Sequence, residues 1–282
     1  MTPSDINQKE KTKIFHQLHH NEKLLVLPNI WDPLGAILLE SLGYPAVATA
    51  SASISYSNGY NDGEQISFPE LLLILQKIVN SVKIPVTADI ESGYAINNSI
   101  LKENIKKLVD TGIAGINFED SRHDAKDMVS VREQCEKITI IKKAAIENGT
   151  ALFINARTDV YIKGNNLSEE EQLIETIMRG KAYKDAGADS FYPIVLTKKE
   201  TIERIVDEVD LPINILLLPG IPGFESLEKM GVARLSLGPG FLKTAINAMK
   251  NVAEKLLNHE GMEEVTNIPI SFDYLTNLIS KT

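Results

Sequence analysis

The sequence has only one cysteine, Cys135, among its 282 residues. A single cysteine excludes an intramolecular disulfide framework, and we expect a reducing compartment, the cytoplasm. Basic residues are also scarce, because Lys and Arg number 29 against 38 Asp and Glu, which gives a formal net charge of −9. Proteins that bind the phosphate backbone need a basic surface, so we expect no nucleic-acid partner.

Long apolar runs and flexible linkers are missing too. Residues 1–13 are polar and lack the apolar stretch of a secretory signal. The longest uncharged stretch, residues 41–61, is rich in Ser, Asn and Gly, whose polar groups would go unsatisfied in lipid, so we expect no membrane partner. No Gly/Ser-rich or Pro-rich segment divides the chain, which predicts one domain over residues 1–282.

Short apolar runs alternate with helical patterns along the chain. The runs are almost continuously apolar, which is typical of parallel strands buried on both faces. Helical patterns cover residues 68–79, 99–110, 131–148, 168–185 and 198–209. Eight strands are predicted, at residues 24–27, 46–49, 86–89, 115–118, 152–155, 190–192, 213–217 and 234–236.

Glycines mark the boundaries between these elements. Each stands between a helical pattern and the next strand, where a left-handed residue commonly ends a helix. The glycines in question are Gly43, Gly112, Gly149, Gly187 and Gly231. Ser67 and Ser168 indicate helix starts, and Ser168 with Glu171 forms a capping box.

This alternation predicts an α/β fold, a (β/α)8 TIM barrel, with an open doubly wound sheet as the alternative. Residues from about 251 to 282 continue in a polar helical pattern after the eighth unit. We expect this segment to form a C-terminal helical arm of the same domain.

Polar residues at the predicted strand ends carry the chemistry, because active sites of such barrels lie at the carboxyl ends of the strands. Asp89 and Glu91 leave one strand end, Glu119 ends the next strand, and Asp62 lies in the loop after the second strand. Neighbouring carboxylates repel one another unless a cation neutralises them, and Mg²⁺ prefers such oxygen ligands. Helix capping or salt bridges are the alternative roles for these acids.

Arg157 ends the fifth strand, on the opposite side of the same predicted barrel mouth. Its guanidinium suits bidentate binding of a substrate carboxylate, with an ion pair to Asp159 or another acid as the alternative. Asn155 either orients a ligand or satisfies the backbone.

These motifs resemble the isocitrate lyase/phosphoenolpyruvate mutase superfamily, and most closely its short lyase/mutase-like branch. The similarity spans residues 24–243. The motifs are PNIWDPLGA at 28–36, TADIESGY at 87–94, FED at 118–120, INARTD at 154–159 and LSLGPG at 235–240, together with the Ser-rich loop that precedes Asp62.

The resemblance implies roles for individual residues. Asp89 would contact Mg²⁺, or Mn²⁺ as an alternative, while Asp62, Glu91 and Glu119 would hold metal-bound waters. A turn would offer backbone N–H groups to the substrate's carboxylate and oxo oxygens, and Arg157 would hold the carboxylate and stabilise an enolate. The residues of that turn are Ser51, Ala52 and Ser53.

The resemblance also implies an assembly. In this superfamily the terminal helix of the barrel is exchanged between subunits, in dimers that pair into tetramers. The helical arm of this chain is compatible with a homo-oligomer of that kind.

The loop after the fourth strand departs from the family pattern. It lacks the lyase-type cysteine and the phosphonopyruvate mutase motif, and Cys135 falls in a helical pattern, where a buried structural thiol is expected. His123 and Lys126 remain as candidates for proton transfer, with a solvated surface role as the alternative for His123.

Two further features receive a structural interpretation. His16, His19 and His20 are expected on a solvated helix face rather than in a metal site. The residues Gly238, Pro239 and Gly240 are expected to form a turn, with phosphate binding as the alternative.

The sequence therefore predicts a Mg²⁺-dependent lyase that acts next to a 2-oxo or 2-hydroxy carboxylate, with Arg157, Glu119 and His123 as catalytic candidates. A phosphonopyruvate-type mutase or hydrolase acting on a P–C bond is one alternative. A non-catalytic 2-oxo-acid binding protein is the other.

Overall fold

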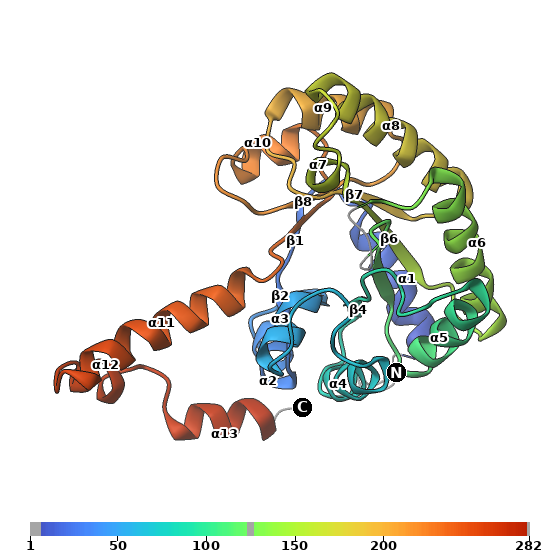
Figure 1. Cartoon of the computed structure of the whole chain (residues 1–282). Helices are drawn as coiled ribbons and strands as arrows, with labels where there is room; N and C mark the ends of the chain where they lie inside the picture. The colour runs from blue at the N-terminus through green and yellow to red at the C-terminus, as the bar shows by residue number, and fades with distance from the viewer. Residues whose placement is uncertain (1–6, 123–126, 281–282) are drawn as a thin grey trace.

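The computed structural model describes residues 7–122 and 127–280. Parallel strands lie inside, and helices follow one another around the outside (Figure 1). The strands are β1 (Leu25–Leu27), β2 (Asn29–Ile30), β3 (Val47–Thr49), β4 (Val86–Asp89), β5 (Gly115–Glu119), β6 (Phe153–Thr158), β7 (Ser190–Pro193), β8 (Asn214–Leu216) and β9 (Arg234–Ser236).

The first predicted strand corresponds to β1, and β2 follows it after Pro28, which has no N–H to donate to a ladder. β2 begins the hydrogen-bonded order β2-β3-β4-β5-β6-β7, and β1 begins the order β1-β9-β8. A single parallel bridge between Phe191 and Ile213 joins β7 to the residue before β8. The strand order therefore continues from one group to the other.

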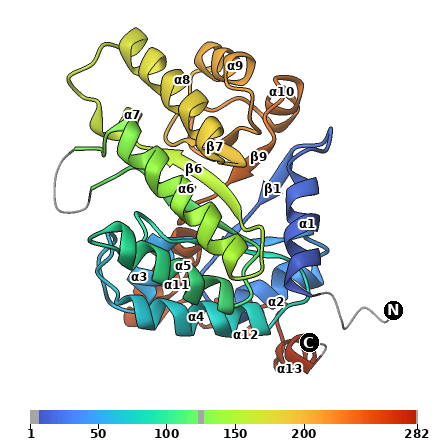
Figure 2. The same ribbon diagram turned by 90° about the vertical axis from the view of Figure 1, so that its right-hand side faces the viewer.

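Thirteen helices lie in the described ranges 7–122 and 127–280. Around the outside, α5 packs against α6 and α6 against α8 (Figure 2). The helices are α1 (Gln8–Leu18), α2 (Pro33–Ser41), α3 (Ser51–Ser57), α4 (Phe68–Asn80), α5 (Asn98–Asp110), α6 (Val131–Glu147), α7 (Val160–Lys163), α8 (Glu169–Ala186), α9 (Lys199–Glu208), α10 (Phe224–Lys229), α11 (Gly240–Leu257), α12 (Met262–Thr266) and α13 (Phe272–Ser280).

Local sequence signals set several of these boundaries. Ser67 and Ser168 both cap their helices in full capping boxes, the first with Glu70 and the second with Glu171. Gly187 ends α8 in the left-handed conformation, with φ of 106°, before β7 begins. The predicted helix starts and this helix end are confirmed.

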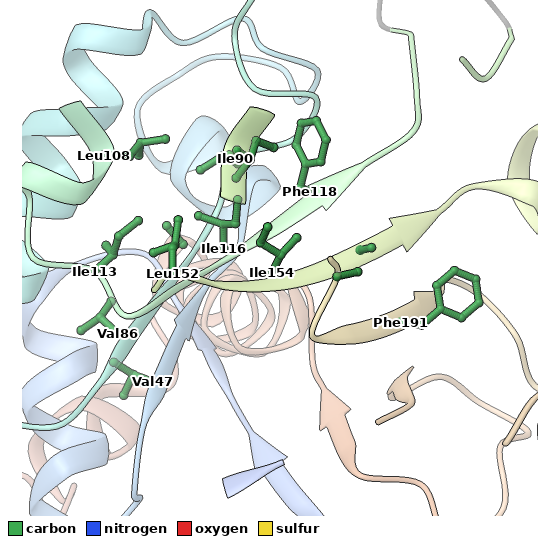
Figure 3. Close-up of a cluster of buried hydrophobic side chains, with 14 of the residues drawn as sticks. Val47, Val86, Ile90, Leu108, Ile113, Ile116, Phe118, Leu152, Ile154 and Phe191 are labelled. Atoms are coloured by element: carbon green, nitrogen blue, oxygen red, sulfur yellow. The ribbon is translucent and has the colours of Figure 1, made fainter. Parts of the chain in front are cut away.

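The hydrophobic core lies between the strands and the outer helices. Val86, Ile116 and Ile154 come from three neighbouring strands and belong to one buried cluster that also contains Leu108 of α5 (Figure 3). The strands bury both faces, and most of their side chains are apolar, but buried polar residues such as Asn117, Asn155 and Arg234 interrupt them. The polar residues described below stand out for that reason.

The C-terminal helices α11 and α12 extend away from the body of the molecule, whereas α13 turns back and contacts α2 (Figure 1). α11 runs across the predicted start of the arm near residue 251. Met249, Leu257 and Phe272 are exposed on these helices, whereas Leu278 of α13 is buried. Among the described residues, no helix combines the length and apolar character that a membrane span requires.

Candidate active site

Five of the predicted site residues line a cavity of about 240 Å³ at the carboxyl ends of the strands. Asp62, Asp89 and Arg157 line it, as do Ser51 and Ala52. Its volume lies below the roughly 300–1,000 Å³ of drug-sized ligand sites, which fits a small substrate.

Asp89 ends β4 and is held by four donors. Its Oδ2 accepts from the backbone N–H of Ser51 at 3.1 Å and from the Ser51 hydroxyl at 3.0 Å. Its Oδ1 accepts from Nδ2 of Asn117 at 2.9 Å and from the N–H of Glu91 at 3.4 Å. The carboxylate therefore has a fixed orientation toward the cavity.

The predicted Ser-rich turn is the first turn of α3. Ser51 and Ala52 line the cavity, but the N–H of Ser51 is directed to Asp89. Ser53 is fully buried behind them, and its hydroxyl has no hydrogen-bond partner among the described residues. The two hydrogen bonds from Ser51 join the start of α3 to the end of β4, across 38 residues of sequence.

Asp62 and Glu91 complete the acidic side of the site. Burial, and next the charge of Asp89, raise the pKa of Asp62. Glu91 is buried beside the cavity, and burial together with Asp89 and Asp62 raises its pKa to about 8. Raised pKa values of this kind indicate that the ionised carboxylates repel one another unless a cation neutralises them.

The loop that carries Glu91 is strained and held by Glu64, a residue that the sequence analysis missed. Glu64, Glu91 and Tyr94 have φ of 56°, 51° and 54°, in the left-handed region that disfavours residues other than glycine. Oε1 of Glu64 accepts from the N–H of Tyr94 at 2.8 Å and from the hydroxyl of Ser92 at 2.7 Å.

Glu91 is fixed from both sides within this loop. Its Oε2 accepts from the N–H of Glu64 at 2.9 Å, and its Oε1 accepts from the Tyr94 hydroxyl at 3.0 Å. The strain and these contacts together position one carboxylate next to Asp89.

Arg157 lies across the site and forms two ion pairs. Nη1 contacts Oε2 of Glu119 at 2.7 Å, and Nε contacts Oδ1 of Asp159 at 2.7 Å. Burial lowers the pKa of Arg157, but Glu119 and Asp159 outweigh it, so the pKa stands well above its usual value. The ion pair with Asp159 is therefore present, and Arg157 also lines the cavity.

Glu119 and Asn155 lie behind the cavity rather than on its surface. Glu119 is buried, and burial raises its pKa against the opposing effect of Arg157. Nδ2 of Asn155 donates to Oδ1 of Asn117 at 3.0 Å, and the hydroxyl of Ser190 donates to Asn155 at 2.7 Å. Asn155 thereby orients Asn117, which in turn binds Asp89.

Asn117 is therefore a further residue of the candidate site that the sequence analysis missed. It lies two positions before Glu119 on β5, and parallel pairing sets it beside both Asp89 and Asn155. Its place on the same strand face as Glu119 was a usable signal.

The remaining candidates for proton transfer and catalysis are His123, Lys126 and Cys135. His123 and Lys126 fall outside the described residues. Cys135 lies on α6, where its Sγ contacts the carbonyl of Ala182 at 3.4 Å, and burial raises its pKa. It does not line the cavity, which agrees with a structural thiol.

The histidine prediction is wrong for His19. His19 is buried and its ring stacks on Phe153, because α1 packs against β6.

The segment from Gly238 to Gly240 forms the expected turn, and α11 starts at Gly240. Oδ1 of Asn29 accepts from the N–H groups of Leu237 and Gly238 at 2.9 and 3.0 Å, which holds the start of this turn.

The acidic side of the cavity fits a hydrated divalent cation. Across residues 7–122 and 127–280, no three His, Cys, Asp or Glu side chains are gathered as direct metal ligands. Mg²⁺ often binds one or two carboxylates and keeps several waters, which is what Asp89 and Asp62 can offer. The donors are all oxygens, as a hard cation requires.

Comparison with known proteins identifies a family and several relatives of this chain. The family model for phosphoenolpyruvate phosphomutase matches residues 15–257. An uncharacterized protein of Mycobacterium tuberculosis is 31% identical over 248 residues, which cover 88% of this chain and 90% of the relative. The 2-methylisocitrate lyase of Bacillus subtilis is 24% identical over 270 residues, which cover 92% and 85%.

Solved structures share the fold. A Burkholderia cenocepacia protein described as a phosphonomutase is 34% identical with a TM-score of 0.83, covering 87% of this chain and 99% of that one. A phosphonopyruvate hydrolase in complex with oxalate and Mg²⁺ has a TM-score of 0.82 at 22% identity, covering 96% and 95%.

Proposed function

Because the chain belongs to the phosphoenolpyruvate phosphomutase family, within the isocitrate lyase/PEP mutase superfamily, we propose that it is a Mg²⁺-dependent carbon–carbon lyase. It would cleave or form a C–C bond next to a 2-oxo or 2-hydroxy carboxylate. The observation that carries this proposal is that Asp89 and Arg157 line one small cavity. A carboxylate that suits a cation and a guanidinium that suits a substrate carboxylate face the same space.

Asp89 would hold the cation directly, and Asp62, Glu91 and Glu119 would hold its waters. When bound, Mg²⁺, or Mn²⁺ in its place, would stabilise negative charge that develops on the substrate's oxygens. The relative named 2-methylisocitrate lyase and the hydrolase solved with oxalate and Mg²⁺ support this metal and a carboxylate substrate.

Arg157 would bind the substrate carboxylate with the N–H groups that are not used in its ion pairs. Its contacts to Glu119 and Asp159 use three of the five N–H groups that a guanidinium carries. The two acids also keep the guanidinium in place, so its charge is available to an enolate without reorganisation. His123 keeps the predicted role in proton transfer.

The backbone N–H of Ser51 donates to Asp89 and would therefore not donate to the substrate. Ser51 would then support the acidic side of the cavity, while Ala52 and Ser53 keep the predicted role of offering backbone N–H groups to the substrate's oxygens. Asn155 would act on the substrate only through Asn117 and Asp89.

We also propose that the strand order closes into a (β/α)8 barrel and that the arm mediates a homo-oligomer, a dimer or tetramer. The bridge at Phe191 and the shared segment around Pro28 support closure. Exposed Met249, Leu257 and Phe272 support burial of α11 to α13 against a second copy, with the terminal helix exchanged. The cytoplasmic location belongs to the same proposal.

Turnover tests this function. The purified full chain is incubated with Mg²⁺ and a panel of 2-oxo and 2-hydroxy acids, with an EDTA-treated sample and an Asp89→Ala variant as controls. Metal-dependent release of a 2-oxo acid fragment such as pyruvate would support the lyase. Conversion of phosphonopyruvate, with or without phosphate release, would favour P–C chemistry, and oxalate binding without any turnover would favour a binding protein.

A further inference from the structure

A second guanidinium lies in the wall of the same cavity. Arg234 lies on β9, two residues before the strand ends, on the same strand face as Ser236. Both residues line the cavity, and Arg234 is only 2% exposed. The sequence analysis treated this arginine only as part of an apolar strand.

The charge of Arg234 has no acidic partner in the described part of the chain. The hydrogen bond of its side chain there runs from Nε to the Ser236 hydroxyl at 3.0 Å. Its Nη1 is buried without a hydrogen-bond partner. A buried cation normally needs a paired anion, since its removal from water is strongly unfavourable.

The other buried arginines of the molecule follow that rule. Arg157 contacts Glu119 and Asp159, and Arg179 contacts Asp120 at 2.9 Å and Glu175 at 2.8 Å. Arg234 is the exception among these three.

The titratable groups near Arg234 do not supply the missing charge. Burial lowers the pKa of His19 to about 3, so its ring is neutral at pH 7. Burial also raises the pKa of Tyr192 above its usual value, so its phenol stays protonated. The charge of Asp89 raises the pKa of Arg234, but no ion pair joins the two among the described residues, and the oxygens of Asp89 accept from Ser51 and Asn117. Burial lowers the pKa of Arg234 itself to about 10, which leaves it charged at pH 7.

We propose that Arg234 is a specificity-determining residue that binds a second anionic group of the substrate. The substrate would therefore be a small dianion, with one carboxylate at Arg157 and a distal carboxylate or phosphonate at Arg234. Thr87 lines the same cavity with a buried hydroxyl that lacks a partner among the described residues, and it would donate to the same group. This inference rests on the proposed function of the site.

Binding calorimetry with matched acids tests the proposal, in the presence of Mg²⁺. Malate and lactate share the 2-hydroxy acid and differ in the distal carboxylate. Phosphonopyruvate and pyruvate differ in the distal phosphonate. The parent protein should bind one dianion at least about tenfold more tightly than its monoanionic partner, and the pair that shows the difference identifies the distal group.

Arg234→Gln should abolish that preference, whereas Arg234→Lys should retain part of it. Oxalate, which lacks a distal group, should bind the parent and both variants within about twofold. Equal preference in the parent and Arg234→Gln, or no preference in the parent, would overturn the role of Arg234. If oxalate fails to bind the parent with Mg²⁺, the proposed function itself is wrong.

Thermal unfolding of the ligand-free variants separates binding from support of the fold. A residue that serves the ligand at the expense of stability can be replaced without loss of stability. Arg234→Met should therefore unfold at the same temperature as the parent or above it. A drop of several degrees, together with lost oxalate binding, would show that Arg234 is structural and overturn the proposal.

Discussion

The guanidinium of Arg157 is chelated by the carboxylate of Asp159, two residues further along the same strand end. Nε donates to Oδ1 at 2.7 Å, and Nη2 donates to Oδ2 at 3.0 Å. Asp159 is itself held, since the Ser121 hydroxyl donates to its Oδ2 and its own N–H donates to Asp120 at 3.0 Å. The orientation of Arg157 therefore depends on a fork that fits both oxygens of one carboxylate.

A lysine at position 157 keeps the charge but cannot reproduce this fork. Arg157→Lys should therefore lose affinity for oxalate in the presence of Mg²⁺ much as Arg157→Ala does. Loss of a buried charge-assisted contact corresponds to about 2–5 kcal/mol, or roughly thirtyfold or more in Kd. Calorimetry measures the affinities, and Arg204→Lys on the exposed face of α9 is the matched control. Equal oxalate affinity in the parent and both variants would make Arg157 a structural ion-pair partner only.

The sequence predicted the elements whose signals are local. Val86–Asp89 and Arg234–Ser236 match the predicted strands at both ends, and Gly187 ends its helix where expected. These assignments rest on apolar runs and on the conformational freedom of glycine, which depend on a few neighbouring residues.

The features that were missed depend on contacts between distant segments. The short helix α3 is rich in serine, a weak helix former, and is fixed by Asp89. His19 is buried only because α1 packs against β6. The pairing of Glu119 with Arg157 follows from the register of β5 and β6, which a single sequence does not specify.

Cys135 provides a test of the departure from the isocitrate lyase pattern. It lies on α6 outside the cavity, with its Sγ near the carbonyl of Ala182. Cys135→Ser should therefore keep most of the activity and the thermal stability of the parent. A loss in kcat of more than about a hundredfold, or ~2.7 kcal/mol in the barrier, at unchanged stability would restore a catalytic cysteine.

Glu91 should make the stability of the metal-free protein depend on pH. Its pKa in the folded protein, about 8, lies above the ~4.3 of an unfolded chain. Between these values the folded state keeps a proton that the unfolded state has lost, so stability is full below the lower value and falls as pH rises toward 8. The slope from this group is at most about 1.4 kcal/mol per pH unit.

Glu91→Gln should reduce the loss of stability that the protein shows as pH rises. The amide oxygen can still accept from the N–H of Glu64, and the amide nitrogen can donate to the Tyr94 oxygen, so both contacts survive. Urea unfolding in EDTA at pH 5, 6.5 and 8 gives the free energies of unfolding. If the parent and the variant lose stability in parallel across this range, Glu91 is ionised in the folded protein and the acidic cluster is less coupled than the geometry indicates.

Asp89 should be the residue on which metal binding depends most. It is the carboxylate that lines the cavity while Ser51 and Asn117 fix both of its oxygens, so its replacement removes a preorganised ligand. Asp89→Asn should weaken Mg²⁺ binding in calorimetry by at least about tenfold, or ~1.4 kcal/mol. Asp207→Asn on the exposed surface of α9 should leave the Kd unchanged.

The same variant should also change the pKa values of its neighbours, provided that circular dichroism shows it to be folded, because unfolding would lower the same values by removing burial. The charge of Asp89 contributes to the raised pKa of both Asp62 and Glu91, so its removal should lower both values. NMR titration of labelled carboxyl groups in the metal-free protein would detect the shift. Unchanged Mg²⁺ affinity in Asp89→Asn, with the neighbouring pKa values lowered as expected, would mean that the cation binds elsewhere and that the acids serve the fold alone.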